Sequence, residues 1–114
     1  MVPLTKEYWE RVVGFCVAEI GAGRTPNPDV LCNSRIKFGA FMDHLSSLPA
    51  RFDRVASGHY ARVQRLALPD GSCVASLHAC ADADKDQTYF LAHLTPQQLA
   101  RVMFPLGALS KPQV

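Results

Sequence analysis

Apolar residues recur at helical spacing over the first twenty positions and predict a helix from about Lys6 to Ile20. The residues of this expected buried stripe are Trp9, Val12, Val13, Cys16, Val17 and Ile20. Thr5 is the expected N-cap, and Leu4 is spaced to form a hydrophobic staple with Trp9. Gly21 and Gly23 mark the expected end of this helix.

A second helix is expected to begin at Cys32 or Asn33 and to end near Leu48, because Pro49 forbids its continuation. The expected buried stripe of this helix consists of Ile36, Phe41, Leu45 and Leu48. The first half of the chain is therefore expected to be helical.

Short extended runs follow. The stretch "DRVASGHYARV" predicts a short buried strand, a break at Ser57 and Gly58, and a second extended run. The stretch "LPDGS" predicts a tight turn at Asp70 and Gly71, and "CVASLHA" is expected to pair back as a strand. The sequence thus predicts a hairpin in the middle of its second half.

The last third predicts a polar loop, "DADKDQ", and then two helices, "TYFLAHL" and "TPQQLARVMF". Thr95 is the expected N-cap of the second, with Pro96 at its first position and Gln98 in the capping-box position. The closing "FPLGALSKPQV" predicts a break followed by the start of another helix.

This order of elements predicts an α/β fold that is incomplete. A buried strand flanked by helices is typical of a parallel sheet, and such a sheet needs several strands with both faces covered. The 114 residues do not contain the partner strands. We therefore expect the chain to be a piece of a longer protein.

Composition narrows the class of protein. With 48% hydrophobic and 19% charged residues, a chain of this length is one small globular domain at most. A net charge of +2 is too small to indicate nucleic-acid binding alone, and no apolar run is long enough to span a membrane. The four cysteines form no C-x-x-C pair, which argues against a metal site and favours free thiols in a reducing compartment.

The stretch "GRTPNPDVLCN" is more constrained than a helix connector requires. Its two prolines stiffen the segment that presents Asp29 and Cys32. A helix N-terminus at Cys32, with Arg24, Arg35 and Lys37 nearby in sequence, would stabilise a thiolate and make Cys32 the most reactive of the cysteines. Asp29 can then act as a general acid or base. In the alternative interpretation, Asp29 caps a helix and Cys32 is a buried first-turn residue.

A second cluster, "ASGHYAR", follows the expected buried strand. Ligands of open α/β sheets lie beyond the carboxyl ends of strands, where Ser57 and Gly58 would let a nucleotide approach the backbone. His59 is a candidate base, although no adjacent residue is expected to pair with it. The alternative is a strand that ends in a turn with an exposed histidine.

A third cluster, "DADKDQTYF", combines Lys85, Asp86 and Gln87. Lys85 can meet a phosphate, and Gln87 can hydrogen-bond a base edge or a ribose. The alternative is a solvated loop before a helix, with Tyr89, Phe90 and Leu91 in the core.

Taken together, the clusters resemble one family, the tRNA-specific 2-thiouridylases. The resemblance covers nearly the whole chain, through "EYWERV", "GRTPNPDVLCNSRIKFGAF", "VASGHYARV", "KDQTYFL" and "FPLGALSKPQV". The first long block and the Lys-Asp-Gln block are the most specific. Details such as "VLCNSRIKFGAFMD" and "ASGHYA" are similar to plant or algal members.

The resemblance implies a fold and a reaction. The fold is part of a Rossmann-like adenine-nucleotide-binding domain of the PP-loop ATPase type, incomplete at both ends. The reaction is thiolation of the wobble uridine of tRNA, in which ATP, with Mg²⁺, activates the C2 oxygen as an adenylate. A cysteine persulfide then supplies the sulfur, which comes from a donor protein such as a cysteine desulfurase or a relay protein.

The resemblance also implies roles for individual residues. Cys32 is similar to the nucleophilic cysteine and Asp29 to the acid or base beside it. The target base is expected to contact Asn27, Pro28 and Asp29, ATP to contact Gly58, and tRNA to contact Lys85, Asp86 and Gln87. No metal ligand is implied. Residues 1–80 would belong to the nucleotide-binding and thiolation domain, and residues 81–114 would begin a helical tRNA-binding region.

Two family features do not occur in these 114 residues. One is the Ser-Gly-Gly-x-Asp-Ser loop for ATP phosphates, and the other is the persulfide cysteine in a Gly-x-Cys-Phe context, which is the expected disulfide partner of Cys32. The chain alone is therefore expected to be inactive. The alternatives are a non-catalytic tRNA-binding module and a truncated gene product. A bacterial protein would be cytoplasmic, and a eukaryotic one would lie in a mitochondrion or plastid.

Overall fold

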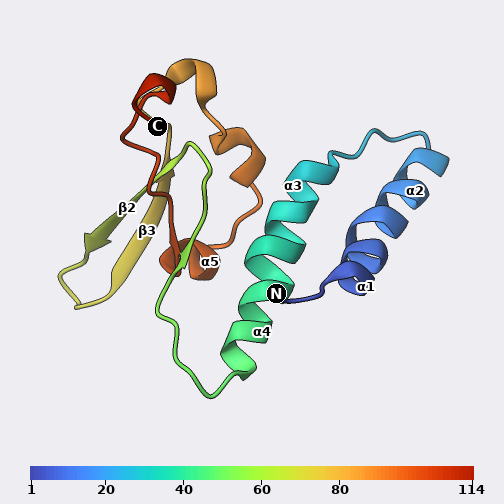
Figure 1. Ribbon diagram of the computed structural model, residues 1–114, viewed down its shortest axis with the longest axis horizontal. Coiled ribbons are helices and arrows are strands. Elements are labelled where there is room, and N and C mark those ends of the chain that lie inside the picture. Colours follow the sequence, from blue (N-terminus) through green and yellow to red (C-terminus); the bar gives the residue numbers. More distant parts are fainter. The chain divides into compact units, whose positions relative to one another are not determined.

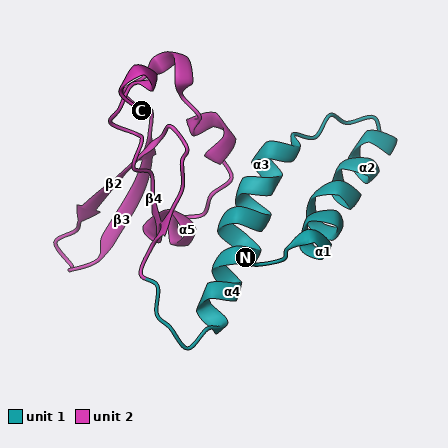
Figure 2. Ribbon diagram, viewed as in Figure 1, with its two compact units in different colours: residues 1–52 teal, residues 53–114 magenta.

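The chain forms two compact units, Met1–Phe52 and Asp53–Val114 (Figure 2). The computed structural model describes all residues from 1 to 114. Unit 1 is helical, whereas unit 2 contains four strands, one α-helix and several 3₁₀ turns (Figure 1). No helix has both the length and the apolar character needed to cross a membrane.

The first helix runs from Thr5 to Gly21, as α1 (Thr5–Tyr8), a π-helical segment η1 (Trp9–Val13) and α2 (Gly14–Gly21). The expected N-cap at Thr5 is wrong, because Leu4 occupies the cap position and makes no side-chain cap hydrogen bond. The expected end is confirmed at Gly23, whose φ of 76° allows the left-handed turn that closes the helix. The Gly23 N–H donates to Ile20 O and the Arg24 N–H to Glu19 O, both at 2.9 Å.

The expected buried stripe on this helix is only partly confirmed. Val12 is fully buried, whereas Trp9, Val17 and Ile20 are 61%, 65% and 64% exposed, so the staple with Trp9 is also wrong. The apolar stripe is broader than the surface that the second helix covers. The apolar contacts of that helix are made with Leu4, Val12 and Cys16.

The second helix runs from Pro28 to Ser47, as α3 (Pro28–Cys32), a π-helical segment η2 (Asn33–Ala40) and α4 (Phe41–Ser47). It therefore begins four residues before the expected start at Cys32. Ile36 is buried as expected, Phe41 and Leu45 are half-buried, and Leu48 lies outside the helix and is exposed. Leu48 adopts an extended conformation because Pro49 follows it.

The two helices of unit 1 pack side by side in an antiparallel hairpin (Figure 1). Their core is a cluster of Val12, Leu31 and Ile36, against which Leu4, Cys16 and Cys32 also pack. Arg35 adds a second link, because its Nη1 donates to the Arg11 carbonyl oxygen at 2.7 Å and its guanidinium lies 4.2 Å from the centre of the Phe15 ring.

Unit 2 contains two small sheets. Strands β1 (Val55–Ala56) and β4 (Val102–Met103) are parallel, which is typical of an α/β fold. The expectation that the 114 residues contain no partner strand for β1 is therefore wrong, because β4 is such a partner. Strands β2 (Arg62–Ala67) and β3 (Cys73–His78) form the expected antiparallel hairpin, with Arg62 opposite His78 and Ala67 opposite Cys73. Gly71, with φ 82°, lies in the turn.

Four expectations for unit 2 need correction. Strand β1 is half-buried to exposed rather than buried. The stretch "TYFLAHL" forms only a 3₁₀ turn, η4 (Thr88–Leu91). Helix α5 (Pro96–Ala100) has the expected capping box at Thr95 and Gln98, but it ends before Val102. There the chain pairs with β1 instead, since the Val55 N–H donates to Arg101 O at 2.8 Å and the Ser57 N–H to Met103 O at 3.0 Å. The chain closes with a 3₁₀ turn, η5 (Lys111–Gln113), where a new helix was expected.

Candidate functional site

The start of the second helix is fixed by Asn27. Its side-chain Oδ1 accepts hydrogen bonds from the backbone N–H groups of Asp29 at 3.0 Å and Val30 at 3.3 Å. Pro28 occupies the first helical position, where no N–H is needed and φ is already near its helical value. The residues Asn27-Pro28-Asp29 therefore form a rigid N-terminal turn.

Asp29 and Cys32 lie one turn apart on this helix. Side chains three residues apart on a helix are neighbours, with Cβ atoms roughly 5–6 Å apart. Asp29 is exposed, whereas Cys32 is half-buried and packs against the cluster of Val12, Leu31 and Ile36. The expected position of Cys32 at the helix N-terminus is wrong, because Asn27 starts the helix five residues earlier. The free N–H groups of the first turn therefore do not surround the Cys32 thiol.

Two of the cations expected near Cys32 are engaged elsewhere. Arg24 forms a bidentate pair with Glu19, with Nε to Oε2 at 2.5 Å and Nη2 to Oε1 at 2.6 Å. This pairing lowers the pKa of Glu19 and raises that of Arg24, mainly through the side-chain hydrogen bonds. Arg35 binds the Arg11 carbonyl and the Phe15 ring. The proposed activation of Cys32 by these two arginines therefore has no support in the geometry.

In unit 2 the loop after β1 and the loop after β3 lie against each other. The Tyr60 N–H donates to Oε1 of Gln87 at 3.0 Å, and the Gln87 N–H donates to the Tyr60 carbonyl oxygen at 2.9 Å. These two hydrogen bonds bring the segments that carry Gly58 and Lys85 together. Sequence reasoning missed Tyr60, because the pair is separated by 27 positions and no local pattern links them.

Asp86 is the second anchor of this loop. Its carboxylate accepts hydrogen bonds from the Cys80 N–H at 2.7 Å, the Thr88 N–H at 3.1 Å and the Thr88 hydroxyl at 3.1 Å. Burial alone would raise the pKa of Asp86, but these hydrogen bonds outweigh it and hold the pKa below its usual range. Asp86 and Gln87 therefore point into unit 2, and Lys85 is the exposed member of the trio.

Gly58 is exposed, and a Cβ atom added there would come no closer than 4.0 Å to Leu106 Cδ1. The surface at Gly58 is therefore open to a ligand. Beside it, Ser57 Oγ and His59 Nδ1 are 2.7 Å apart, which corrects the expectation that no adjacent residue pairs with His59. The His59 ring also lies edge-on to Phe104, with centroids 6.0 Å apart.

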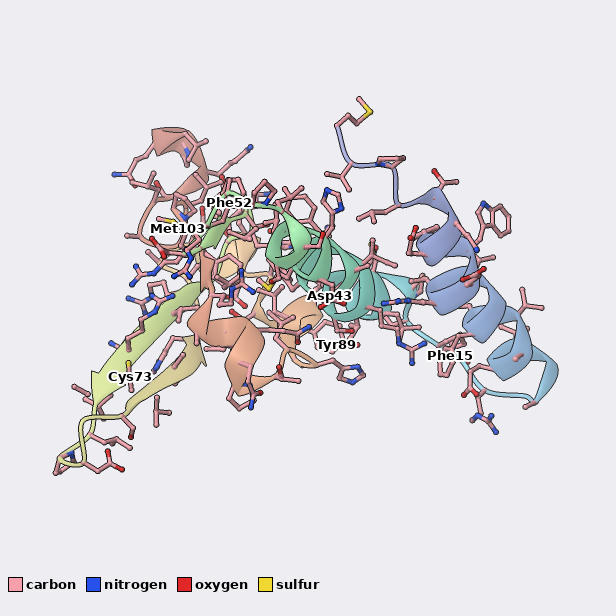
Figure 3. All side chains as sticks on the ribbon, turned by 90° about the horizontal axis from the view of Figure 1, so that it is seen from below. Phe15, Asp43, Phe52, Cys73, Tyr89 and Met103 are labelled. Atoms are coloured by element: carbon pink, nitrogen blue, oxygen red, sulfur yellow. The ribbon has the colours of Figure 1, made fainter.

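All four cysteines are free thiols. Cys73 is exposed on the β2–β3 hairpin (Figure 3), Cys16 and Cys32 are half-buried, and Cys80 is buried. The Cys80 thiol donates to the Asp82 carbonyl oxygen at 2.9 Å. Burial raises the pKa of Cys80, and the nearby carboxylates of Asp86 and Asp82 add to this effect. No three His, Cys, Asp or Glu side chains come together in a way that could hold a metal ion.

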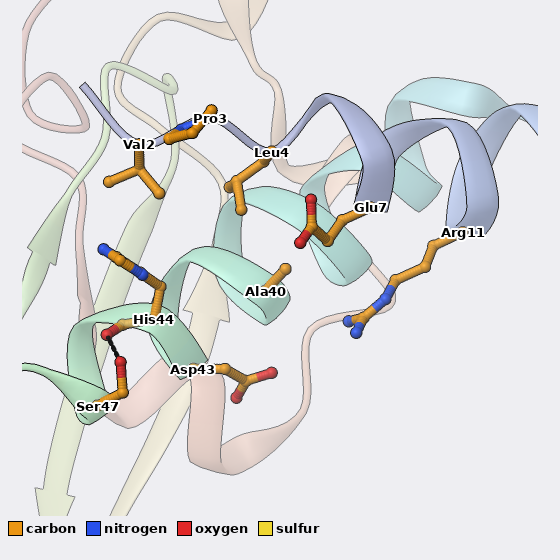
Figure 4. Close-up of a pocket in the computed structure, with 9 residues that line it drawn as sticks. All are labelled: Val2, Pro3, Leu4, Glu7, Arg11, Ala40, Asp43, His44 and Ser47. Carbon is orange, nitrogen blue, oxygen red and sulfur yellow. Dashed lines mark hydrogen bonds between the residues drawn. The ribbon is translucent and has the colours of Figure 1, made fainter.

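A pocket of about 460 Å³ lies within unit 1, between the N-terminal segment and α4 (Figure 4). Glu7 and Arg11 come from the first helix, and Asp43 and His44 come from α4. The Ser47 hydroxyl donates to the His44 carbonyl oxygen at 2.7 Å. The pocket is mixed in charge and contains none of the site residues expected from the sequence.

The whole chain is similar to one protein family and to several known proteins. The model of the family described as "tRNA methyl transferase HUP domain" matches residues 1–114. The chain is 53% identical over 113 residues to the "tRNA-specific 2-thiouridylase MnmA" of Streptococcus mutans serotype c. It is 52% identical to the proteins of the same name from Lactococcus lactis subsp. lactis and Pediococcus pentosaceus. Each match covers 99% of the chain but only 28–29% of the relative, so the chain spans less than a third of the length of these relatives.

Proposed function

The chain belongs to the tRNA methyl transferase HUP domain family, and we propose that it is the part of a tRNA 2-thiouridylase that holds the target uridine beside a nucleophilic cysteine. The observation that carries this proposal is the Asn27-capped helix start. It holds Asp29 and Cys32 one turn apart, with the carboxylate exposed and the thiol half-buried.

The family description names methyl transfer, whereas the three relatives are named thiouridylases. Identity above 50% over 99% of the chain favours the relatives' activity. A cysteine with a neighbouring carboxylate also suits transfer of sulfur, because a thiolate can form and break S–S bonds. The proposed reaction is therefore ATP-dependent 2-thiolation of a uridine in tRNA, at the wobble position.

The residues in the first turn of the second helix have distinct roles in this proposal. Pro28 and the cap formed by Asn27 keep the turn rigid, so that the protein loses little conformational entropy when it binds the target uridine. In this proposal the uridine is flipped out of the base stack when it binds. Asp29 is exposed and can accept or donate a proton at the uracil ring. The Cys32 thiolate attacks the inner sulfur of the persulfide on the carrier cysteine, so that the S–S bond breaks, the outer sulfur leaves as hydrosulfide and the two cysteines become joined by a disulfide. The hydrosulfide forms the new bond to C2 of the uridine, and the C2 oxygen leaves with AMP.

The tRNA body is proposed to contact Lys85, the exposed residue of the Lys85-Asp86-Gln87 trio. Asp86 and Gln87 take part by holding the loop in place through Cys80, Thr88 and Tyr60. The functional boundary is proposed at residue 80, with residues 81–114 beginning the tRNA-binding region.

ATP is proposed to approach the open surface at Gly58. When bound, ATP makes the C2 oxygen of the uridine a better leaving group. The chain supplies one wall of this site, because no Ser-Gly-Gly-x-Asp-Ser phosphate loop occurs in its 114 residues. Mg²⁺ is proposed to arrive with the phosphates, and the persulfide sulfur is proposed to come from a donor protein. The 114 residues alone are therefore expected to be inactive.

Segment exchange tests this proposal. In the hybrid enzyme, residues 1–114 replace the matching segment of the Streptococcus mutans relative, so that the rest of that protein supplies what this chain lacks. We expect the hybrid enzyme to thiolate tRNA in the presence of ATP and a sulfur donor. Retarded migration of the tRNA in mercury-containing acrylamide detects the product. A folded hybrid enzyme that methylates tRNA, or that only binds it, would contradict the proposal.

A further inference from the structure

Three arginines of unit 2 line one pocket, called here the arginine pocket. Its volume is about 310 Å³, and its walls include Arg54, Arg62, Gln64, Arg65, Met103 and Phe104. This volume is at the small end of ligand pockets, which usually measure about 300–1,000 Å³. The pocket is therefore large enough for one small charged group of a ligand and a small apolar part next to it.

Two of the three guanidinium groups are held by backbone carbonyls. Arg62 Nε donates to the Ala79 carbonyl oxygen at 2.7 Å. Arg65 Nη2 donates to the carbonyl oxygens of Val102 at 2.5 Å and Ala100 at 3.3 Å. A guanidinium group has five N–H donors, so both arginines keep donors for a ligand while their orientation is restricted.

None of the three arginines forms an ion pair, whereas Arg24 and Lys6 of unit 1 pair with Glu19 and Glu10. Asp53 precedes Arg54 in the sequence, but it does not line the pocket and forms no ion pair with the three arginines. Two other carboxylates of unit 2 are engaged elsewhere. Asp70 accepts hydrogen bonds from Ser72, and Asp82 accepts one from the Lys111 N–H at 2.8 Å. The pocket thus gathers three positive charges without a carboxylate among its lining residues.

We propose that the arginine pocket binds a backbone phosphate of RNA. Guanidinium groups bind phosphate oxygens in pairs of parallel hydrogen bonds, and three of them can surround one phosphate. The Gln64 amide adds a donor, and Met103 and Phe104 offer apolar surface to the adjoining ribose. The inference rests on the proposed function for its ligand, tRNA, and it adds a contact to the one proposed for Lys85.

The test compares two single substitutions in one loop. Arg54→Gln removes a charge from the pocket, and Arg54 makes no hydrogen bond within the chain that the fold would lose. Arg51→Gln is the matched control, because Arg51 is also exposed, lies three residues away and does not line the pocket. Both are made in the chain and in the hybrid enzyme. Fluorescence anisotropy then measures binding of labelled tRNA between about 50 and 200 mM salt.

We expect Arg54→Gln to weaken tRNA binding about tenfold, or about 1.4 kcal/mol. The slope of log affinity against log salt should fall by about 0.9, the value for one lost phosphate contact. Arg51→Gln should change neither quantity appreciably. Arg54→Lys should restore part of the affinity, because it returns the charge without the planar pair of donors.

Four results would overturn the inference. Equal losses of tRNA affinity in Arg54→Gln and Arg51→Gln would show that tRNA binding depends on net charge alone. Unchanged binding by Arg54→Gln would refute the pocket and leave the proposed function standing, whereas absence of tRNA binding by both wild-type proteins would count against both proposals. Inorganic pyrophosphate, added at matched ionic strength, separates the sources of phosphate. If it displaces tRNA more strongly than salt does, and only when Arg54 is present, the two compete for one phosphate site, which supports the inference. If it binds in an Arg54-dependent way without displacing tRNA, the pocket binds a small free phosphate instead.

Discussion

Gln87 holds the backbone of Tyr60 by two hydrogen bonds. Its Oε1 accepts from the Tyr60 N–H at 3.0 Å, and its own N–H donates to the Tyr60 carbonyl oxygen at 2.9 Å. Gly58 lies two residues before Tyr60, and Lys85 lies two residues before Gln87. This pair therefore fixes the proposed ATP-contacting loop and the proposed tRNA-contacting loop against each other within unit 2.

Substitution of Gln87 tests this connection. Gln87→Ala removes the side-chain acceptor of a backbone N–H that belongs to a buried residue, and should cost about 1 kcal/mol of unfolding free energy. The Tyr60 amide should then exchange its hydrogen faster with solvent. Gln87→Glu keeps an acceptor oxygen and should protect the amide better. Hydrogen exchange followed by NMR measures both effects, and an unchanged Tyr60 rate in Gln87→Ala would contradict the assigned role.

Cysteine reactivity should follow exposure in the folded chain. The sequence led to the expectation that Cys32 reacts first, but the structure favours Cys73, which is exposed, over the half-buried Cys32. Cys80 should react last, because it is buried and its pKa is raised. Alkylation followed by peptide mapping gives the order. Labelling of Cys80 before Cys73 would contradict the described burial.

The same thiol predicts a dependence of stability on pH. The raised pKa means that folding favours the neutral thiol of Cys80. Its contribution is fully present below the ordinary thiol pKa of about 8.5 and is lost as pH rises through the higher folded value. Cys80→Ser, whose hydroxyl does not titrate in this range, should show a smaller loss of stability over the same alkaline range. Thermal unfolding measured across this range compares the two.

Two glycines should respond differently to alanine. A Cβ atom at Gly107 would collide with the Ala61 carbonyl oxygen, which is backbone and cannot move away cheaply. Gly107→Ala should therefore cost about 1–3 kcal/mol of stability. Gly58→Ala is the control, because its Cβ would meet nothing closer than 4.0 Å and should change stability by less than about 0.5 kcal/mol. Chemical denaturation that ranked the two variants in the opposite order would show that the described packing is wrong.

Two substitutions of Asn27 separate its role as the helix cap from its proposed contact with the target base. Asn27→Ala removes the cap of the second helix and should cost about 1 kcal/mol. Asn27→Asp keeps the cap, since a carboxylate oxygen also accepts from the Asp29 and Val30 N–H groups, but it removes the amide donor proposed to meet the target base. In the hybrid enzyme, Asn27→Asp should therefore retain its melting temperature and lose thiolation activity. Full activity of Asn27→Asp would mean that Asn27 serves only as a cap.

Local chemistry in the sequence accounted for much of the fold. The Thr95–Gln98 capping box, the turn at Asp70 and Gly71 and the helix end at Gly23 depend on near neighbours, and all three are confirmed. The start of the second helix is also a local signal, in Asn27 followed by Pro28, which the expected start at Cys32 overlooks. A cap and a proline at the first position were sufficient to place it.

Features that depend on distant partners could not be predicted in this way. Val102 and Met103 continue a helical pattern, yet they form a strand because β1, almost fifty positions earlier, supplies hydrogen bonds. The inward direction of Gln87 likewise depends on Tyr60. The apolar spacing of the first helix predicts a helix, but burial along it depends on the facing helix, so that Val12 is buried whereas Trp9, Val17 and Ile20 are exposed.

The central claim, that Cys32 is the nucleophile of a tRNA thiolation reaction, is tested most directly in the hybrid enzyme. Cys32→Ser should abolish the mercury-dependent gel retardation of tRNA, while tRNA binding and the melting temperature stay close to those of the parent hybrid enzyme. Cys73→Ser is the matched control, because this exposed hairpin cysteine has no proposed role and its loss should leave thiolation intact. Undiminished thiolation by a folded Cys32→Ser hybrid enzyme would contradict the account.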